Sequence, residues 1–507
     1  MKKEQEIEKK HYRCPGQSYT ISNSVCRGRQ RVNYPKCGVC LEKVEELEHM
    51  KLSQTEHKLS TDIFKSYDIR GKYPSEIDDL TACKIGTSVA RFFKKNNPNT
   101  KTVVVGRDVR LSSKPLANAL IEGICKAGLN VVNVGVVSSE MTYFAVGFYH
   151  YDGGIMVTAS HNPAHYNGFK ICREQAIPVS YDTGIDRIAQ YSRQYSPPRG
   201  EQLGKVIVHD IFEDYKKHVL KFAGNLRRLR IVVDAGNGLA GKTVPFVCKG
   251  LPIEIIPLYF ELDGTFPNHD PDPLKPENLI DLQKKVREEK AHLGVAFDGD
   301  ADRCVFVDEM GRTIGCDLIT VLLARHFLER ENGATILYDL RSSWIVSEEI
   351  KAAKGIPCRE RVGHSHMKTT LREKNAVMGG ELSGHYYFRD NFYADSAMIA
   401  FLMVLDILSK KRVPLSNMVA PLRKYYSTGE INFEVKDKDT KIEEIAKKFS
   451  NGRQDYLDGI TVEYNDWWFN VRKSHTEPVL RLNLEGKTAE IMKKGKKALI
   501  DIIQDKS

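Results

Sequence analysis

The sequence predicts three related α/β domains followed by a C-terminal α+β domain, with a small Cys/His module at the N-terminus. From residue 59 onward, short β-branched runs alternate with amphipathic segments, as in KTVVVGRD followed by PLANALIEGICKAG, which is typical of a parallel sheet covered by helices. Three strands end in similar polar or glycine-rich turns, at Asp108, Asp234 and Asp339, which indicates a repeated unit. The tail differs, because EINFEVKD, GITVEYND and VLRLNLEG have the pattern of antiparallel strands.

Length and composition agree with several buried cores. At about 150 residues per domain, a chain of 507 residues with 41% apolar content holds about three domains or more. The N-terminus is charged and lacks the apolar stretch of a secretory signal, and no apolar run is long enough to span a membrane. We therefore expect a cytoplasmic protein with no membrane contact, whose eleven cysteines are mostly reduced.

The formal net charge of +10 fits nucleic acid, a membrane surface or small acidic substrates as partners. Lys and Arg are scattered along the chain, and no long basic block stands out. This distribution favours a solvated surface with a few anion sites, so nucleic acid is not expected.

Residues 1–58 form the predicted module. His11 and Cys14 make an H-x-x-C pair, and Cys37 and Cys40 make a C-x-x-C pair. Together these four residues have the spacing of a Cys₃His zinc site, with Cys26 as an alternative to His11. Unrelated cysteines in a flexible tail are the other interpretation. We expect a zinc ribbon, followed by a connecting helix, that docks on the remaining domains or on a protein partner.

Residues 59–206 form the first predicted α/β domain. Its segment GGIMVTASHNPAHYNGFK places Ser160 directly after an apolar strand, beside His161. A serine at the end of a strand next to an imidazole is a candidate nucleophile. A serine that caps a helix or a turn has the same local pattern.

Residues 207–310 form the second α/β domain, and its segment GVAFDGDADRC carries the strongest chemical signal. Asp298, Asp300 and Asp302 alternate with small residues at the end of an apolar run. Such closely spaced carboxylates repel one another unless a cation lies among them, and hard oxygen ligands suit Mg²⁺. The glycine and glutamate spacing of an EF-hand calcium loop is absent. Arg303 follows as a planar donor for phosphate.

The last two domains are predicted over residues 311–424 and 425–507. The first contains GGELSGHYYF, in which donors and acceptors alternate on permissive backbone, as suits sugar hydroxyls. The second contains VRKSHTEPVLRL, which gathers donors suited to a phosphate dianion. The candidate residues of these two loops are Glu381, Ser383 and His385, and then Arg472, Ser474, His475, Thr476 and Arg481.

In this order, TASHNP, DGDADR, GGELSGH and RKSHTEP resemble the four active-site loops of the α-D-phosphohexomutase superfamily. FKSYDIRGKYP, DGTFPNHDPDPLKPENL and VGHSHMK are similar to its phosphomannomutase/phosphoglucomutase branch. The resemblance implies a heart-shaped, four-domain, Mg²⁺-dependent enzyme that interconverts hexose 1-phosphates and 6-phosphates. It also implies that Ser160 carries a phosphoryl group, with a hexose 1,6-bisphosphate as intermediate and activator. His475 departs from the family pattern, which usually has a small or amide residue there.

The resemblance also implies individual roles. Lys170 and His385 resemble the general acid and base of the family, and His364 resembles a ligand contact. The resemblance places Tyr67 and Arg70 near the reaction centre, and assigns Arg303 to the charge of the transferred phosphate. At position 382 the hydrophobic Leu382 resembles the residue of the mannose/glucose branch. Two alternatives remain, a phosphoglucosamine mutase and a non-catalytic sugar-phosphate sensor that acts through the N-terminal module.

Overall fold

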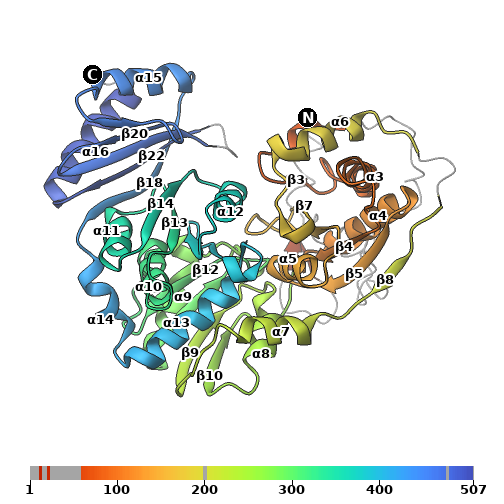
Figure 1. The fold of residues 1–507 in the computed structure, drawn as a ribbon, viewed down its shortest axis with the longest axis horizontal. Helices are drawn as coiled ribbons and strands as arrows, with labels where there is room; N and C mark the ends of the chain where they lie inside the picture. Colours follow the sequence, from red (N-terminus) through yellow and green to blue (C-terminus); the bar gives the residue numbers. More distant parts are fainter. Residues whose placement is uncertain (1–10, 14–19, 23–58, 198–201, 475–478, 506–507) are drawn as a thin grey trace.

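The structure is a computed structural model that describes residues 11–13, 20–22, 59–197, 202–474 and 479–505. Three sheets flanked by helices follow one another along the chain, and a fourth, antiparallel sheet lies at the C-terminal end (Figure 1). The predicted four-domain α/β architecture is confirmed, and we number its domains I to IV in chain order.

Domain I contains six strands in the order β3-β7-β6-β4-β5-β8, with β3 and β7 antiparallel to their neighbours. Every residue of β6 is buried, as its continuous apolar sequence requires. The strands are β3 (Ile69–Lys72), β4 (Thr102–Arg107), β5 (Asn130–Val136), β6 (Gly153–Val157), β7 (Tyr166–Arg173) and β8 (Val206–Val208). The helices are α3 (Asp79–Asn96), α4 (Ser113–Lys126), α5 (Ser139–Phe148) and α6 (Asp186–Arg193).

Domains II and III contain sheets ordered β10-β9-β11-β12 and β14-β13-β15-β16-β17. In each of these sheet orders the first three strands are parallel, and the fourth strand is antiparallel to the third. Domain II has β9 (Leu229–Asp234), β10 (Ile253–Leu258), β11 (Leu293–Phe297), β12 (Cys304–Asp308), α7 (Phe212–Leu220), α8 (Ala240–Cys248) and α9 (Ile280–Glu288). Domain III has β13 (Thr335–Asp339), β14 (Ile356–Glu360), β15 (Met378–Gly380), β16 (Tyr386–Phe388), β17 (Ala394–Asp395), α10 (Cys316–Leu328), α11 (Trp344–Ala352), α12 (His364–Glu373), α13 (Ala397–Lys411) and α14 (Leu415–Val419).

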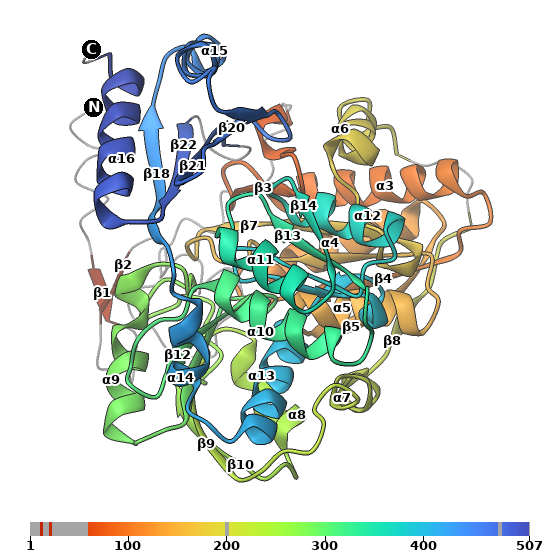
Figure 2. The same ribbon diagram turned by 60° about the vertical axis from the view of Figure 1, so that its left-hand side comes forward.

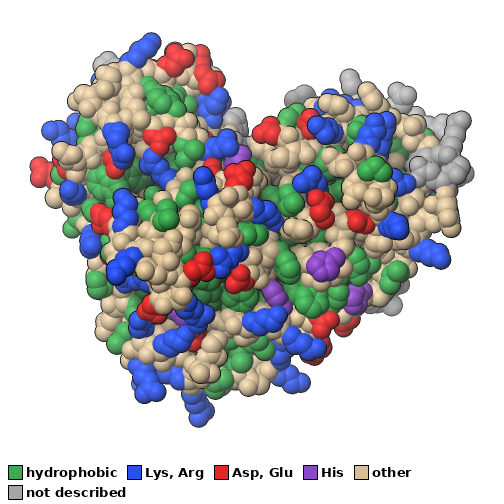
Figure 3. All heavy atoms as spheres, in the orientation of Figure 1, with side chains coloured by type: hydrophobic (Ala, Val, Ile, Leu, Met, Phe, Trp, Pro, Cys, Tyr) green, Lys and Arg blue, Asp and Glu red, His purple; other side chains and the backbone are tan. Residues whose placement is uncertain are grey.

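Domain IV is an antiparallel sheet ordered β18-β22-β21-β20-β19 with two helices. Strand β18 follows α14 along the chain and thus connects domain III to domain IV, and it is also an edge strand of the domain IV sheet (Figures 1 and 2). Its elements are β18 (Tyr426–Glu434), β19 (Arg453–Asp455), β20 (Ile460–Glu463), β21 (Trp467–Lys473), β22 (Val479–Gly486), α15 (Lys438–Lys448) and α16 (Ala489–Ile503). In the space-filling view a notch separates domain IV from domain I, and Lys, Arg and His side chains lie at its foot (Figure 3).

One apolar core runs through domains I, II and III, and domains I and IV each have a further core of their own. Helix α13 lies inside the shared core, and residues 397–409 are all buried. A helix that is apolar on all sides belongs in the interior, which accounts for the longest apolar run of the sequence. Within the described ranges, no helix combines the length and the apolar character that crossing a membrane requires.

Only two short strands of the N-terminal region are described, β1 (His11–Arg13) and β2 (Thr20–Ser22), which pair antiparallel. The predicted zinc ligands Cys14, Cys37 and Cys40, and the alternative ligand Cys26, lie outside the described residues. The zinc ribbon therefore stays a prediction.

Candidate active site

The loop that follows β6 holds Ser160 in an uncommon conformation. Ser160 is fully buried, and its φ of 51° lies in the left-handed region. Its Oγ donates a hydrogen bond to Asp298 Oδ2 at 2.7 Å, although 138 positions separate the two residues. His161 Nδ1 lies 3.4 Å from the same Oγ. Desolvation and the positive charge of Arg303 hold the pKa of His161 well below its usual value, so this imidazole is neutral.

Arg110, which was not predicted from the sequence, holds this loop. The residue is 1% exposed, and its guanidinium donates to the backbone carbonyls of Ser160 (2.7 Å), Asn162 (2.6 Å), Pro163 (2.7 Å) and Tyr166 (3.2 Å). Its Nε also donates to the buried Asp108, 3.1 Å away. The signal was present in GRDVR, directly after a predicted strand, but nothing in that motif names the carbonyls that the arginine would bind.

The metal-loop aspartates follow β11, whose residues are all buried. Asp298, Asp300 and Asp302 are fully buried and offer one carboxylate oxygen each within 4.8 Å of one another. Within the described part of the chain, Asp300 Oδ1 has no hydrogen-bond partner. Gly299 lies so close to the nucleophile loop that an added Cβ would be 2.7 Å from the Ser160 carbonyl oxygen. The two loops are therefore packed backbone to backbone.

Lys170 from β7 offsets part of the negative charge of this group. Its Nζ lies 2.7 Å from Asp300 Oδ2 and also forms an ion pair with Asp302. Burial alone would lower the pKa of Lys170, but the aspartates raise it above its usual value, so the side chain is an ammonium. Burial and the two neighbouring carboxylates raise the pKa of Asp298 well above its usual value. A cation among the three carboxylates would relieve that repulsion.

A second residue that the sequence analysis did not identify joins domain I to this loop. Ser139, at the start of α5, donates from Oγ to Asp300 Oδ2 at 2.5 Å and from its backbone nitrogen to the Asp300 carbonyl at 3.1 Å. Ser139 thus fixes both the side chain and the backbone of a candidate metal ligand.

The third loop follows β15 and brings Glu381, Ser383 and His385 to the same place. His385 Nε2 lies 3.4 Å from Asp302 Oδ1 and accepts a hydrogen bond from Arg303 Nε at 3.2 Å. Ser383 Oγ lies 2.9 Å from His385 Nδ1. The Glu381 carboxylate is buried and accepts from the Gly363 backbone nitrogen at 3.0 Å and from the Tyr387 hydroxyl.

Tyr67, Arg70 and His364 lie around these loops. The Tyr67 hydroxyl donates to the Val362 carbonyl at 2.9 Å, and its ring meets His364 edge-on at 5.6 Å. Arg70 donates to the side chain of Asn162 at 2.5 Å, inside the nucleophile loop, and forms an ion pair with Asp68. These contacts bring the strands and helices of domains I and III together at one point.

The described basic residues of the fourth-loop region, in domain IV, gather around the carboxylate of Glu430. Arg472 is 1% exposed and forms an ion pair with Glu430, and Arg481 Nη1 lies 3.0 Å from the same carboxylate. Arg341 Nη1, from the turn after β13, lies 3.5 Å from it. Ser474 is described, whereas His475 and Thr476 lie outside the described residues. Arg341 was not predicted as a site residue from the sequence, although DLRSS follows the third of the repeated strands.

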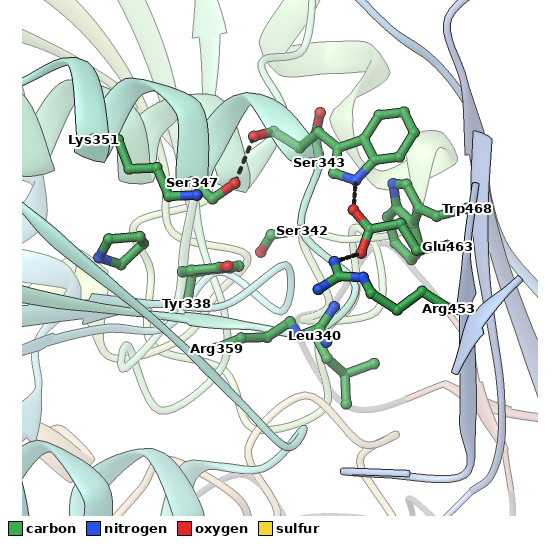
Figure 4. Close-up of a pocket in the computed structure, with 12 residues that line it drawn as sticks. Tyr338, Leu340, Ser342, Ser343, Ser347, Lys351, Arg359, Arg453, Glu463 and Trp468 are labelled. Atoms are coloured by element: carbon green, nitrogen blue, oxygen red, sulfur yellow. Dashed lines mark hydrogen bonds and ion pairs between the residues drawn. The ribbon is translucent and has the colours of Figure 1, made fainter. Parts of the chain in front are cut away.

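Domain IV connects to the other loops through domain III. Arg341 forms an ion pair with Asp339 at 2.7 Å, and Asp339 Oδ2 accepts from the backbone nitrogen of Leu382, in the third loop, at 2.7 Å. A cavity of about 320 Å³ lies at the same junction of domains III and IV and contains none of the predicted site residues (Figure 4). Across it, Trp344 Nε1 donates to Glu463 at 2.8 Å. This tryptophan therefore ties α11 to the domain IV sheet.

Comparison with known proteins gives consistent matches along the chain. Models of the phosphoglucomutase/phosphomannomutase α/β/α domains I, II and III match residues 61–198, 213–311 and 316–425, and the model of the C-terminal domain matches residues 430–502. The chain is 40% identical over 435 residues to a phosphomannomutase from Vibrio cholerae, covering 84% of this chain and 94% of that protein. It is 40% identical over 437 residues to a phosphomannomutase from Salmonella typhimurium, covering 84% and 94%.

Among solved structures, a phosphoglucomutase/phosphomannomutase family protein from Burkholderia thailandensis superposes with a TM-score of 0.80 at 33% identity. The match covers 88% of this chain and 98% of that protein.

Proposed function

The chain belongs to the phosphoglucomutase/phosphomannomutase family and is a phosphohexomutase, and from this premise we propose how its own residues carry the reaction. Ser160 carries the phosphoryl group and passes it to the free hydroxyl of a hexose phosphate. The resulting hexose 1,6-bisphosphate turns over in the cleft and returns its other phosphate to Ser160. The single observation that carries this assignment is the Ser160 Oγ–Asp298 Oδ2 contact of 2.7 Å, which places the hydroxyl against the acidic loop.

The three aspartates fit a magnesium ion. They supply an all-oxygen donor set within 4.8 Å, and Asp300 Oδ1 has no hydrogen-bond partner among the described residues. Asp298, Asp300 and Asp302 would hold the ion, with an oxygen of Ser160 as a further ligand. Bound there, Mg²⁺ would supply Lewis-acid polarisation of a phosphoryl oxygen.

The surrounding side chains hold charge and protons. The Arg303 guanidinium would stabilise charge on the transferred phosphate, since it already faces Asp298 at 3.7 Å. We assign the general acid and base to Lys170 and His385, because both contact Asp302 in the acidic loop, to which Ser160 is hydrogen-bonded through Asp298. The neutral His161 can accept a hydrogen bond at the nucleophile. Arg70 orders the loop of Ser160 through its hydrogen bond to the side chain of Asn162.

The remaining candidates would hold the rest of the ligand. We assign the sugar hydroxyls to Glu381 and Ser383, with Tyr67 and His364 beside them. The phosphate that is distant from Ser160 is assigned to the cationic group of domains III and IV, because Arg472 is buried with its Nε lacking a hydrogen-bond partner within the described ranges. That group consists of Arg341, Arg472, Ser474, His475, Thr476 and Arg481.

We propose mannose and glucose phosphates as substrates. The curated relatives at 40% identity are named phosphomannomutases, and the apolar Leu382 lies between the two sugar-binding candidates. Phosphoglucosamine mutase is the alternative within the enzyme class. The sensor alternative is not favoured, because Ser160 and all three aspartates are present.

A coupled assay tests this proposal. Mannose 1-phosphate, glucose 1-phosphate and glucosamine 1-phosphate are supplied in parallel to the parent and to Ser160→Ala. We expect turnover of the first two, and its loss in the variant with hexose-phosphate binding retained. Turnover of glucosamine 1-phosphate alone would reject the substrate assignment. Undiminished turnover by Ser160→Ala would reject the nucleophile.

For the N-terminal module, we propose one structural zinc bound by His11, Cys14, Cys37 and Cys40, supported by the spacing of these residues in a chain expected in the reducing cytoplasm. Metal analysis of purified protein is expected to find about one zinc per chain. Cys37→Ser is expected to lose the zinc and retain mutase turnover. A zinc-free native protein would reject the site.

A further inference from the structure

Three arginines from two domains converge on one carboxylate, that of Glu430. Arg481 Nη1 lies 3.0 Å from Glu430 Oε1, and Arg472 and Arg341 both pair with Oε2, the latter at 3.5 Å. We call these four residues the Glu430 cluster. Arg341 belongs to domain III and the other three residues to domain IV, so the carboxylate bridges the two domains.

The backbone aims Glu430 at the arginines. Strand β18 pairs with β22, but the register shifts between Ser427 and Glu430. Gly429, within the shift, has a φ of 65°, which a side-chain-bearing residue rarely adopts. A bulge of this kind redirects the side chain that follows it. The position of Glu430 is therefore a property of the strand that connects domain III to domain IV.

The charges in the cluster do not cancel. The cluster holds three guanidinium groups and one carboxylate; Asp339 pairs with Arg341 and the charge of Asp458 also acts on Arg472, but Glu430 is the carboxylate that all three guanidinium groups share. In the described part of the chain, the Nε of the buried Arg472 has no hydrogen-bond partner. A carboxylate carries one charge, whereas a phosphate dianion carries two and more acceptor oxygens. The arginines are thus better matched to a phosphate than to Glu430.

We propose that Glu430 is a positioning residue that acts as an internal counter-anion, holding the arginines in place while the phosphate is away and competing with the phosphate when it binds. The inference rests on the proposed function, in which this cluster holds the distant phosphate. A bisphosphorylated intermediate must release that phosphate once in every turnover in order to turn around. Glu430 offers the arginines a replacement partner at that moment, so it weakens phosphate binding and speeds release.

Charge removal at Glu430 tests the proposal. Glu430→Gln keeps the size of the side chain, and Glu434→Gln removes the same charge from an exposed position on the same strand. The dissociation constant of mannose 1-phosphate is measured by calorimetry with both substitutions in the Ser160→Ala background, which cannot turn over. We expect Glu430→Gln to bind at least about threefold more tightly and Glu434→Gln to bind as the parent does. In the active enzyme, Glu430→Gln should lower both KM and kcat.

The outcomes separate the inference from the proposed function. A merely structural role for Glu430 predicts weaker binding, so an unchanged or raised dissociation constant in a variant with the parent's thermal midpoint would overturn the proposal. Should Glu430→Gln unfold, Glu430→Asp, which withdraws the carboxylate, must give the same tightening for the proposal to stand. Arg472→Gln is expected to weaken binding at least tenfold. Failure of that variant to do so would reject the phosphate assignment itself, and the inference with it.

Discussion

Replacing Arg110 with lysine tests whether this guanidinium holds the nucleophile loop in its working shape. The side chain is 1% exposed and donates to the carboxylate of Asp108 and to the backbone carbonyls of residues 160, 162, 163 and 166. Lysine keeps the positive charge, but a single ammonium has three donors in place of five. At least two of these five acceptors, of which three are only partly buried, therefore lose their partner.

The size of the effect follows from those acceptors. Each fully buried acceptor without a partner costs about 1–3 kcal/mol, and a partly buried one costs less because water can reach it, so the loss of two partners lowers the free energy of unfolding by at most roughly 6 kcal/mol. The left-handed Ser160 adds strain of about 1–3 kcal/mol that only its surroundings enforce. Once the hydrogen bonds from residue 110 to this loop weaken, we expect the loop to change conformation and Ser160 Oγ to move. A displacement of about 1 Å at a reacting atom lowers kcat on the order of 100-fold.

The assay compares kcat with the dissociation constant of a hexose phosphate, both measured below the thermal midpoint of the variant. We expect kcat to fall about 100-fold and the dissociation constant to stay within about twofold, because the described hydrogen bonds of the Arg110 guanidinium go to the loop of Ser160 and to Asp108, and not to the residues assigned to the sugar or the distant phosphate. Arg312→Lys is the matched control, since Arg312 also pairs with a buried carboxylate, that of Asp308 at 2.9 Å, on the hairpin after β12. An unchanged kcat in a folded Arg110→Lys, or binding that weakens in parallel with kcat, would refute the reasoning.

Three further predictions concern buried titratable side chains. Asp300→Asn is expected to weaken Mg²⁺ binding, measured directly by calorimetry, at least about tenfold and to lower turnover with it; parent-like Mg²⁺ affinity would contradict the metal assignment. Burial raises the pKa of Glu140 to about 8, so the folded protein retains a proton that the unfolded chain loses near pH 4.5. Stability relative to Glu140→Gln should therefore fall as pH rises between these values, by up to about 5 kcal/mol, and denaturant unfolding at pH 5 and pH 8 would show no difference if the carboxyl were ionised. Burial lowers the pKa of His326 to about 4, so the parent should lose stability relative to His326→Asn as pH falls from 6.5 to 4, whereas parallel unfolding curves would show that this imidazole is not buried as a neutral group.

The architecture and the reactive loops were predictable because each depends on residues that are adjacent in sequence. Alternating β-branched and amphipathic segments identified the α/β domains, and the structure places Asp298 and Glu381 directly after strands β11 and β15. The ends of strands from these sheets lie together, so motifs far apart in sequence come into contact. Ser160 and Asp298 are such a pair. The third loop also reaches this place, through the contact of His385 with Asp302.

The supports of the site could not be predicted in the same way, since their partners are set by the tertiary fold. Arg110 binds mainly backbone carbonyls, and a carbonyl leaves no trace in the residue type. Ser139 reaches Asp300 across 161 positions, and a serine at the start of a helix is ordinarily explained as a cap. Glu430 faces its arginines only because a bulge shifts the register of β18. The alternation of apolar and polar residues in the sequence does not show where a strand contains one extra residue. Reactive groups can be recognised in a sequence by their chemistry, whereas the groups that position them can be recognised only by their contacts in the fold. The variants at Arg110 and Glu430 therefore test whether these contacts position the reacting groups or only stabilise the fold.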